Sequence, residues 1–381
     1  MTSFVVNTRL PELGLWSELE GKDIPVSFDL ELTARCNNDC RHCYINLPAG
    51  DREARARELT FDEIIAVADQ AVELGALWCL LTGGEPLLRP DFSDIYVALK
   101  RRGLLVSLFT NACLLRPEHI ELFRRYPPRD VEITIYGAQR ETYERVTRVP
   151  GSYDAFLRGV RLLDEGGVGA SYKATVMRSN AHELAAMAEF GRAHTKGIFR
   201  FDTLLHLRYD RDPARNAEIC AERLSAAEIA ALEQSDGERA AAARRECHRV
   251  ADAAEPEDPS ILFRCHVDQG FTVGHDGSLR LCSSLWHPDY VGDVRREPLA
   301  PAWRRLLTKA RAARSRDAAH LERCAVCGLV DLCLWCPAHA YLEVGSLTQP
   351  IDEFCDAAHD RARVFGDPAV QGNDPRVPDI S

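Results

Sequence analysis

The chain has 381 residues, of which 46% are hydrophobic and 28% charged, a balance that excludes a largely disordered protein. At about 150 residues per domain, this length predicts two or three domains. The net charge of −11 argues against a nucleic-acid partner, and no run approaches the ~20 apolar residues that cross a bilayer. Residues 1–10 lack the apolar run of a secretory signal, so we expect a cytoplasmic protein without membrane attachment.

Strand-like and helix-like segments alternate along the first half of the chain. Strands are predicted at residues 26–33, 77–82, 104–110, 131–136, 168–177 and 199–207. Helices are predicted between them at 61–74, 91–102, 117–125, 153–165 and 182–194. Such alternation implies right-handed βαβ units and a parallel sheet. Because a closed barrel needs eight units, the six predict an α/β fold with a partial, TIM-like (β/α)6 barrel and ligands beyond the carboxyl ends of the strands.

The composition divides the chain into five parts. Residues 26–210 are the predicted barrel, preceded by a lead-in over 1–25. Residues 211–260 are rich in Ala, Glu and Arg and are predicted to form a helical bridge. Cysteines and turns dominate 261–360, which is typical of a small domain held together by metal, and 361–381 are predicted to be a tail.

The number of cysteines, 14, is high for a chain without an export signal. Disulfides do not persist in a reducing compartment, so metal or redox chemistry is the expected use of most of them. Cys79, Cys113 and Cys220 have no partner at a ligand-like spacing. We expect Cys79 and Cys113, which lie in or beside predicted strands, to be core thiols.

The first cysteine cluster, CxxxCxxC, directly follows the first predicted strand and consists of Cys36, Cys40 and Cys43. Three thiolates on one loop can hold three corners of a four-iron cluster and leave the fourth iron open. A structural zinc ion would require a fourth ligand. Polar and glycine-rich motifs follow the next strands, namely Gly83-Gly84-Glu85-Pro86, Thr110-Asn111 and Thr134, with Arg148 further along the chain.

This order of motifs, over roughly residues 25–210, resembles the radical S-adenosylmethionine (SAM) superfamily. The resemblance implies an enzyme whose 4Fe-4S cluster, reduced by a flavodoxin- or ferredoxin-type donor, cleaves SAM to a radical that takes hydrogen from an unactivated carbon. It implies that Glu85 accepts a hydrogen bond from the SAM ammonium and that Arg148 pairs with its carboxylate. The cofactor-binding set that it implies is Gly83, Gly84, Glu85, Pro86, Thr110, Asn111, Thr134 and Arg148.

The cysteines after residue 260 resemble a SPASM domain, a C-terminal extension of radical SAM enzymes that binds two auxiliary iron–sulfur clusters. The resemblance assigns Cys265, Cys282 and Cys336 to the first auxiliary cluster, and Cys324, Cys327, Cys333 and Cys355 to the second. Two residues separate Cys333 from Cys336, where the family has three. The first set contains only three cysteines. Its fourth ligand is expected to be Cys247 or the substrate, or the site is open. A zinc module built from the CxxC pairs is the alternative.

Most relatives with a SPASM domain modify peptides, so we predict a radical SAM enzyme that forms a carbon–carbon, ether or thioether cross-link in a ribosomally made precursor peptide. A small molecule or cofactor precursor, of the tetrapyrrole or quinone type, is an alternative substrate. Sulfatase maturation is less favoured because Ser283 follows Cys282 where that branch has its Asp base. A non-catalytic zinc or iron–sulfur scaffold is the remaining alternative. Residues 1–25 are too few for a leader-binding domain, so a separate protein is expected to bind any leader.

Overall fold

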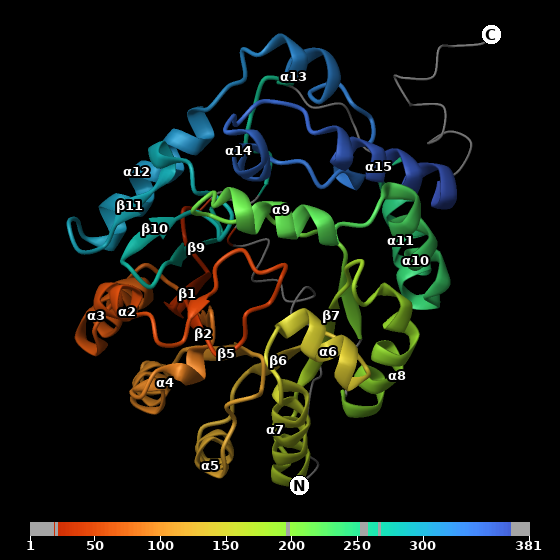
Figure 1. Ribbon diagram of the computed structural model, residues 1–381. Coiled ribbons are helices and arrows are strands. Elements are labelled where there is room, and N and C mark those ends of the chain that lie inside the picture. Colours follow the sequence, from red (N-terminus) through yellow and green to blue (C-terminus); the bar gives the residue numbers. More distant parts are fainter. Residues whose placement is uncertain (1–18, 20–21, 196–198, 252–257, 266–267, 367–381) are drawn as a thin grey trace, which may run out of the picture.

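The computed structural model describes residues 19, 22–195, 199–251, 258–265 and 268–366 (Figure 1). Its centre is one large sheet, whose strands are β1 (Ser27–Thr33), β4 (Trp78–Gly83), β5 (Leu105–Thr110), β6 (Asp130–Ile135), β7 (Ser171–Thr175), β8 (Arg200–Asp202), β9 (Gly270–Val273), β10 (Ser278–Arg280) and β11 (Gly292–Asp293). The strand order is β11-β10-β9-β1-β4-β5-β6-β7-β8. The short strands β2 (Arg35–Cys36) and β3 (Leu47–Pro48) pair separately.

The strands from β1 to β8 in the large sheet run parallel to one another, which confirms the predicted α/β fold with a parallel, open barrel. Each predicted strand has a counterpart, but the last one is much shorter than expected. Residues 203–207 leave the sheet after β8, and Leu205 and Leu207 pack in a separate apolar cluster with Val146 and Leu342. The apolar side chains of this segment are buried by that tertiary contact. A local pattern cannot distinguish such a buried segment from a strand.

Helices cover the outer face of the barrel, as Figure 1 shows. They are α3 (Phe61–Glu73), α4 (Phe92–Arg101), α5 (Pro117–Arg125), α7 (Ser152–Gly166) and α8 (Leu184–His194). Each buries one apolar face against the sheet, and α3 begins with a capping box between Thr60 and Glu63. The sequence analysis missed two short helices, α2 (Arg52–Arg57) and α6 (Arg140–Thr147), because charged residues dominate both.

The C-terminal half adds helices α9 (Pro213–Glu222), α10 (Ala226–Ser235), α11 (Gly237–Ala251), α12 (Leu299–Ala312), α13 (Ala318–Arg323), α14 (Pro337–Val344) and α15 (Asp352–Phe365). β9 pairs in parallel with β1, from Ser27↔Gly270 to Leu30↔Val273. The C-terminal strands therefore extend the barrel sheet, and the boundary expected between 260 and 261 does not separate two sheets. The sequence analysis did not predict β9, because this strand has only four residues and its partner is far away in the sequence.

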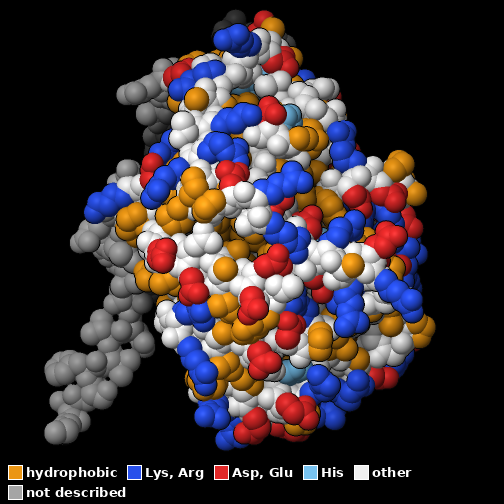
Figure 2. Space-filling view, turned by 90° about the vertical axis from the view of Figure 1, so that its left-hand side faces the viewer, with side chains coloured by type: hydrophobic (Ala, Val, Ile, Leu, Met, Phe, Trp, Pro, Cys, Tyr) orange, Lys and Arg blue, Asp and Glu red, His pale blue; other side chains and the backbone are white. Residues whose placement is uncertain are grey.

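In Figure 2, acidic and basic side chains are interspersed over the visible face, without a continuous tract of either sign. Within the described ranges, no helix has both the length and the apolar character needed to cross a membrane.

Candidate active site

A cavity of about 590 Å³ lies at the carboxyl ends of the barrel strands. Alternation along β1 builds part of its wall, since successive side chains of a strand face opposite sides. Phe28 and Leu30 point into the core beneath the helices, whereas Asp29 and Glu31 line the cavity. The sequence analysis did not select these two carboxylates. Their positions in an alternating, otherwise apolar strand were the available signal.

The three cysteines of the CxxxCxxC motif line this cavity together. Burial, and next repulsion from Cys43 and Cys36, raise the pKa of Cys40 well above its usual value. Neighbouring buried thiols cannot ionise together without a positive partner, so this donor set fits an iron–sulfur cluster. Among the described residues, no three His, Cys, Asp or Glu side chains surround a single-ion position. A four-iron cluster holds its ligands farther apart than one ion does.

The two glycines after β4 also line the cavity, and they make a close backbone contact. Gly83 has φ +125°, and a Cβ there would collide with the carbonyl oxygen of Thr33. A Cβ on Gly84 would lie 2.6 Å from the carbonyl oxygen of Ala34. The glycines are thus required so that this turn can pack on the backbone that leads to Cys36.

The carboxylate of Glu85, which was expected to bind the SAM ammonium, is not among the groups that line the cavity. It is fully buried and accepts hydrogen bonds from Leu87 N at 3.1 Å, Thr110 Oγ1 at 2.8 Å and Asn111 N at 2.9 Å. Burial raises its pKa to about 7, and these hydrogen bonds oppose that change. Pro86 begins a short 3-10 helix and is buried outside the cavity wall as well. Glu85 therefore ties the end of β4 to the end of β5.

Thr110, Asn111 and Thr134 line the cavity, as expected for ligand-binding groups. Asn111 also supports the cysteine loop, because its Nδ2 donates to Asn37 Oδ1 at 2.9 Å and lies 3.6 Å from Cys36 Sγ. The structure thus joins the end of β5 to the loop that carries the cysteines.

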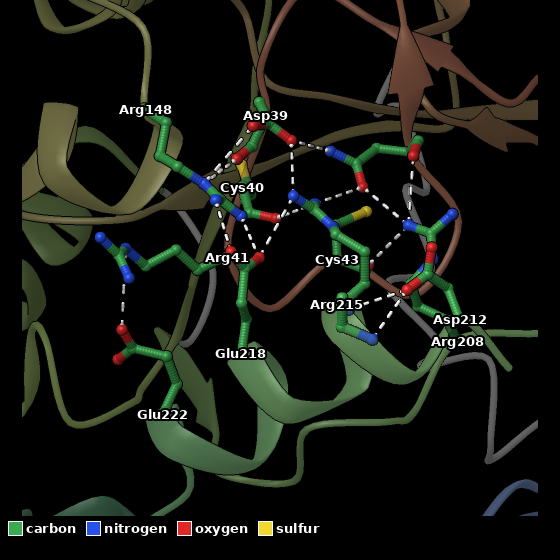
Figure 3. Close-up of polar contacts among 12 residues, drawn as sticks. Asp39, Cys40, Arg41, Cys43, Arg148, Arg208, Asp212, Arg215, Glu218 and Glu222 are labelled. Carbon is green, nitrogen blue, oxygen red and sulfur yellow. Dashed lines mark hydrogen bonds and ion pairs between the residues drawn. The ribbon is translucent and has the colours of Figure 1, made fainter.

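Arg148, which was expected to pair with the SAM carboxylate, is not among the residues that line the cavity, and its guanidinium contacts other protein groups (Figure 3). Its guanidinium donates to both carboxylate oxygens of Glu218, at 2.9 and 2.6 Å, and its Nε donates to the carbonyl oxygen of Asp39 at 2.9 Å. Glu218 belongs to α9, and this helix cannot be placed near Arg148 from the sequence.

The C-terminal cysteines gather in the two groups that the sequence analysis expected. Burial, and next Cys282 and Cys336, raise the pKa of Cys265 to about 11. The second group, Cys324, Cys327, Cys333 and Cys355, lines a small pocket together. Cys336 thus stays with the first group despite its shortened spacing.

Cys247 does not lie with the first auxiliary group, for which it was a candidate ligand. It is 1% exposed and packs with Leu329 and Leu332 in an apolar cluster that Cys327 and Cys333 contact. Cys79 and Cys113 are buried in the main core, as expected. Ser283 lines the cavity.

Comparisons with known proteins place this arrangement in context. The sequence model of the Radical SAM superfamily matches residues 30–191. An AdoMet-dependent heme synthase of Methanosarcina barkeri is 27% identical over 83% of this chain and 92% of that protein. A PqqA peptide cyclase of Gluconobacter oxydans is 29% identical over 49% of this chain and 50% of that protein. Streptococcus suis SuiB bound to the precursor peptide SuiA shares the fold, with a TM-score of 0.66 and 14% identity over 93% of this chain and 84% of its own.

Proposed function

We propose that the chain is a radical SAM enzyme, as the match to that superfamily over residues 30–191 indicates, and that its substrate is a peptide in which it forms a cross-link. Its cofactors are SAM and a 4Fe-4S cluster, as the match to the Radical SAM superfamily implies. In this proposal Cys36, Cys40 and Cys43 hold that cluster. The two C-terminal cysteine groups hold auxiliary clusters, as in a SPASM domain.

The size of the cavity is the observation that carries the proposal. Pockets of 300–1,000 Å³ hold one drug-sized ligand, and SAM alone is such a ligand. The cavity of about 590 Å³ has to hold the cluster as well as SAM, so the space that remains favours an amino-acid side chain over a whole macrocycle. A peptide can insert one side chain and leave the rest of its chain outside.

The charge of the cavity supports the same choice. Asp29, Glu31 and Asp202 line it together with Lys173, whose Nζ lies 2.6 Å from Glu132. In the described part of the chain, Asp29 and Asp202 have no ion-pair partner. Tetrapyrrole precursors carry several carboxylates, which the carboxylates of Asp29 and Asp202 would repel. A neutral or basic peptide side chain meets no such repulsion.

The protein's own residues orient and shield the reaction. When SAM and a reduced cluster are bound, they supply the removal of a hydrogen atom from an unactivated carbon. Gly83, Gly84 and Thr134 form the wall against which SAM lies in this proposal. The barrel strands and their helices exclude bulk water from the other sides of the cavity. Ser283 stands where a sulfatase-maturing enzyme has its Asp base, which disfavours that reaction.

The test is the intact mass of a peptide encoded by the short open reading frame nearest this gene, co-expressed with the enzyme at low oxygen. A cross-link removes two hydrogens from the peptide. The control is the Cys36/Cys40/Cys43→Ala variant, which should leave the mass unchanged. If the iron-loaded enzyme cleaves SAM but never changes the peptide, even with a leader-binding protein and a flavodoxin- or ferredoxin-type donor present, the peptide proposal fails.

A tetrapyrrole is the second candidate substrate, because the similarity to the heme synthase extends over 92% of that relative. The same enzyme preparation, with SAM and reductant, should then change the absorption spectrum and mass of an iron-coproporphyrin. We expect no change, since the cavity is small and acidic. Conversion at a rate above that of the triple cysteine variant would replace the peptide proposal with this one.

A further inference from the structure

The cysteine loop, residues 36–46, contacts two arginines that follow the last barrel strand (Figure 3). The side chains of Cys36, Cys40 and Cys43 line the cavity. Several carbonyl groups of the same loop accept hydrogen bonds from guanidinium groups instead. The loop has almost no regular structure, so these contacts are a large part of what determines its shape.

Arg208 is the more buried of the two, at 2% exposure. Its Nη1 donates to the carbonyl oxygens of Cys43 at 3.3 Å and Asn46 at 3.2 Å, and to Asn46 Oδ1 at 3.1 Å. Its Nη2 donates to Asp210 at 2.7 Å. One guanidinium thus fixes the backbone on the C-terminal side of the motif.

Arg215, in the first half of α9, contacts the middle of the loop. Its Nη2 donates to the carbonyl oxygen of Cys40 at 3.2 Å and to Asn46 Oδ1 at 3.2 Å. Its Nη1 pairs with Asp39 at 3.0 Å and with Glu218 at 3.3 Å. The planar fork of arginine makes these simultaneous contacts possible, whereas a lysine has one ammonium at a single point.

We propose that Arg208 and Arg215 are positioning residues of the iron–sulfur site. They hold the loop so that its thiolates face the cavity, and they place positive charge beside the cluster. This inference rests on the proposed cluster ligands Cys36, Cys40 and Cys43. Because Arg215 lies beyond residues 30–191, the site extends past the radical SAM domain into the helical bridge.

Two effects should be separable by experiment. Loss of the planar guanidinium frees the cysteine loop and weakens retention of the cluster, whether or not the new side chain is charged. Loss of the cation leaves Asp210 or Asp39 less compensated, which disfavours the reduced, more negative cluster and lowers its reduction potential. A merely structural arginine would affect folding and would not change a potential.

The test uses the full-length, reconstituted enzyme under anaerobic conditions. Iron release to a chelator is followed in the wild type and in R208Q, R208K, R215Q and R215K. Iron release is resolved into kinetic phases, and the phase that is missing in the Cys36/Cys40/Cys43→Ala variant reports release from this cluster. Redox titration monitored by electron paramagnetic resonance gives its midpoint potential. R178Q is the matched control, because Arg178 is exposed and bonds to Glu228 and to the carbonyl of Arg223.

We expect the two Gln variants to release iron about tenfold faster in that phase, with the other phases unchanged and the midpoint potential lowered. The Lys variants should also release iron faster but keep the potential of the wild type. If a Gln variant does not fold, as judged by circular dichroism, the Lys variant of the same residue decides the question of retention.

The proposal would be overturned if the substituted enzymes released iron at the wild-type rate and kept the wild-type midpoint potential. It would also be overturned if R178Q accelerated iron release as much as they do. If the triple cysteine variant instead keeps every phase, the ligand assignment itself is wrong. That result is distinct from a failure of the arginines alone.

Discussion

Arg280 donates a hydrogen bond from Nη2 to Glu31 Oε2 at 2.6 Å, across the junction between the C-terminal strands and the barrel. Both side chains are almost completely buried, at 0% and 1% exposure. The guanidinium carbon lies 3.5 Å from the ring centroid of Trp286. This ion pair joins β10 to the wall of the cavity, so the C-terminal strands take part in shaping the site.

We expect Arg280→Met alone to lower the free energy of unfolding by about 3–5 kcal/mol, because it leaves Glu31 buried without its partner. Adding Glu31→Gln should recover much of that loss, since no charge then remains buried. Anaerobic urea unfolding measures both values. The exposed pair Arg140–Asp154 is the control, and its Arg140→Gln variant should be near the wild type. A double variant as unstable as the sum of its single variants would contradict the buried-pair interpretation.

The Asp29 carboxylate should make stability depend on pH. Burial raises its pKa from 3.8 to about 6, with a smaller opposing effect from the Thr272 hydroxyl, which donates to it. The folded state therefore favours the protonated acid, and this contribution is present below pH 4 and lost as the pH rises through about 6.

Asp29→Asn should therefore be more stable than the wild type at pH 8, by about 1–2 kcal/mol, because the cavity hydrates part of the carboxylate. The gain should shrink as the pH falls towards 5. Urea unfolding between pH 5 and 8 checks this, with the exposed Asp202→Asn as the control for charge. A gain that does not depend on pH would exclude titration of Asp29 as the cause.

Gly84→Ala should damage the proposed SAM site through the backbone. The new Cβ meets carbonyl oxygens at residues 34 and 35, so the turn has to move away from the cysteine loop, at a cost of about 1–3 kcal/mol. We expect at least a tenfold weaker affinity for SAM in anaerobic equilibrium dialysis. Gly50→Ala is the control, because no atom lies within 4 Å of the added Cβ. Unchanged affinity in Gly84→Ala would show that this turn does not bind SAM.

The two C-terminal cysteine groups should lose iron independently. Cys282→Ala is expected to remove the cluster of Cys265 and Cys336, and Cys333→Ala that of the other group, each about four irons for a 4Fe-4S cluster. Iron and sulfide analysis of the reconstituted enzyme measures this. Cys220→Ala, at an exposed position on α9, should lose none. Loss of both clusters in either variant would mean that the groups are not separate sites.

Local patterns in the sequence were sufficient for the barrel, whereas the two C-terminal cysteine groups were assigned by the resemblance to a SPASM domain. The periods of strands and helices depend on nearby residues, so α5 was predicted with its observed limits and most other elements within a few residues. The hydrogen bonds that Glu85 accepts from Thr110 and Asn111 could not be predicted, because these partners lie at the end of the next strand. A motif shows that a carboxylate is present but does not show where it points.

By itself, the sequence determined the parallel α/β barrel and the order of the motifs at the strand ends, because these depend on spacing and residue type. Only the tertiary structure decided which side chains share a volume. It placed Asp29 and Glu31 in the cavity, turned Arg148 towards Glu218, and brought Arg208 and Arg215 to the cysteine loop. Such contacts join residues far apart in the chain, and their geometry is set by packing, which no local pattern encodes.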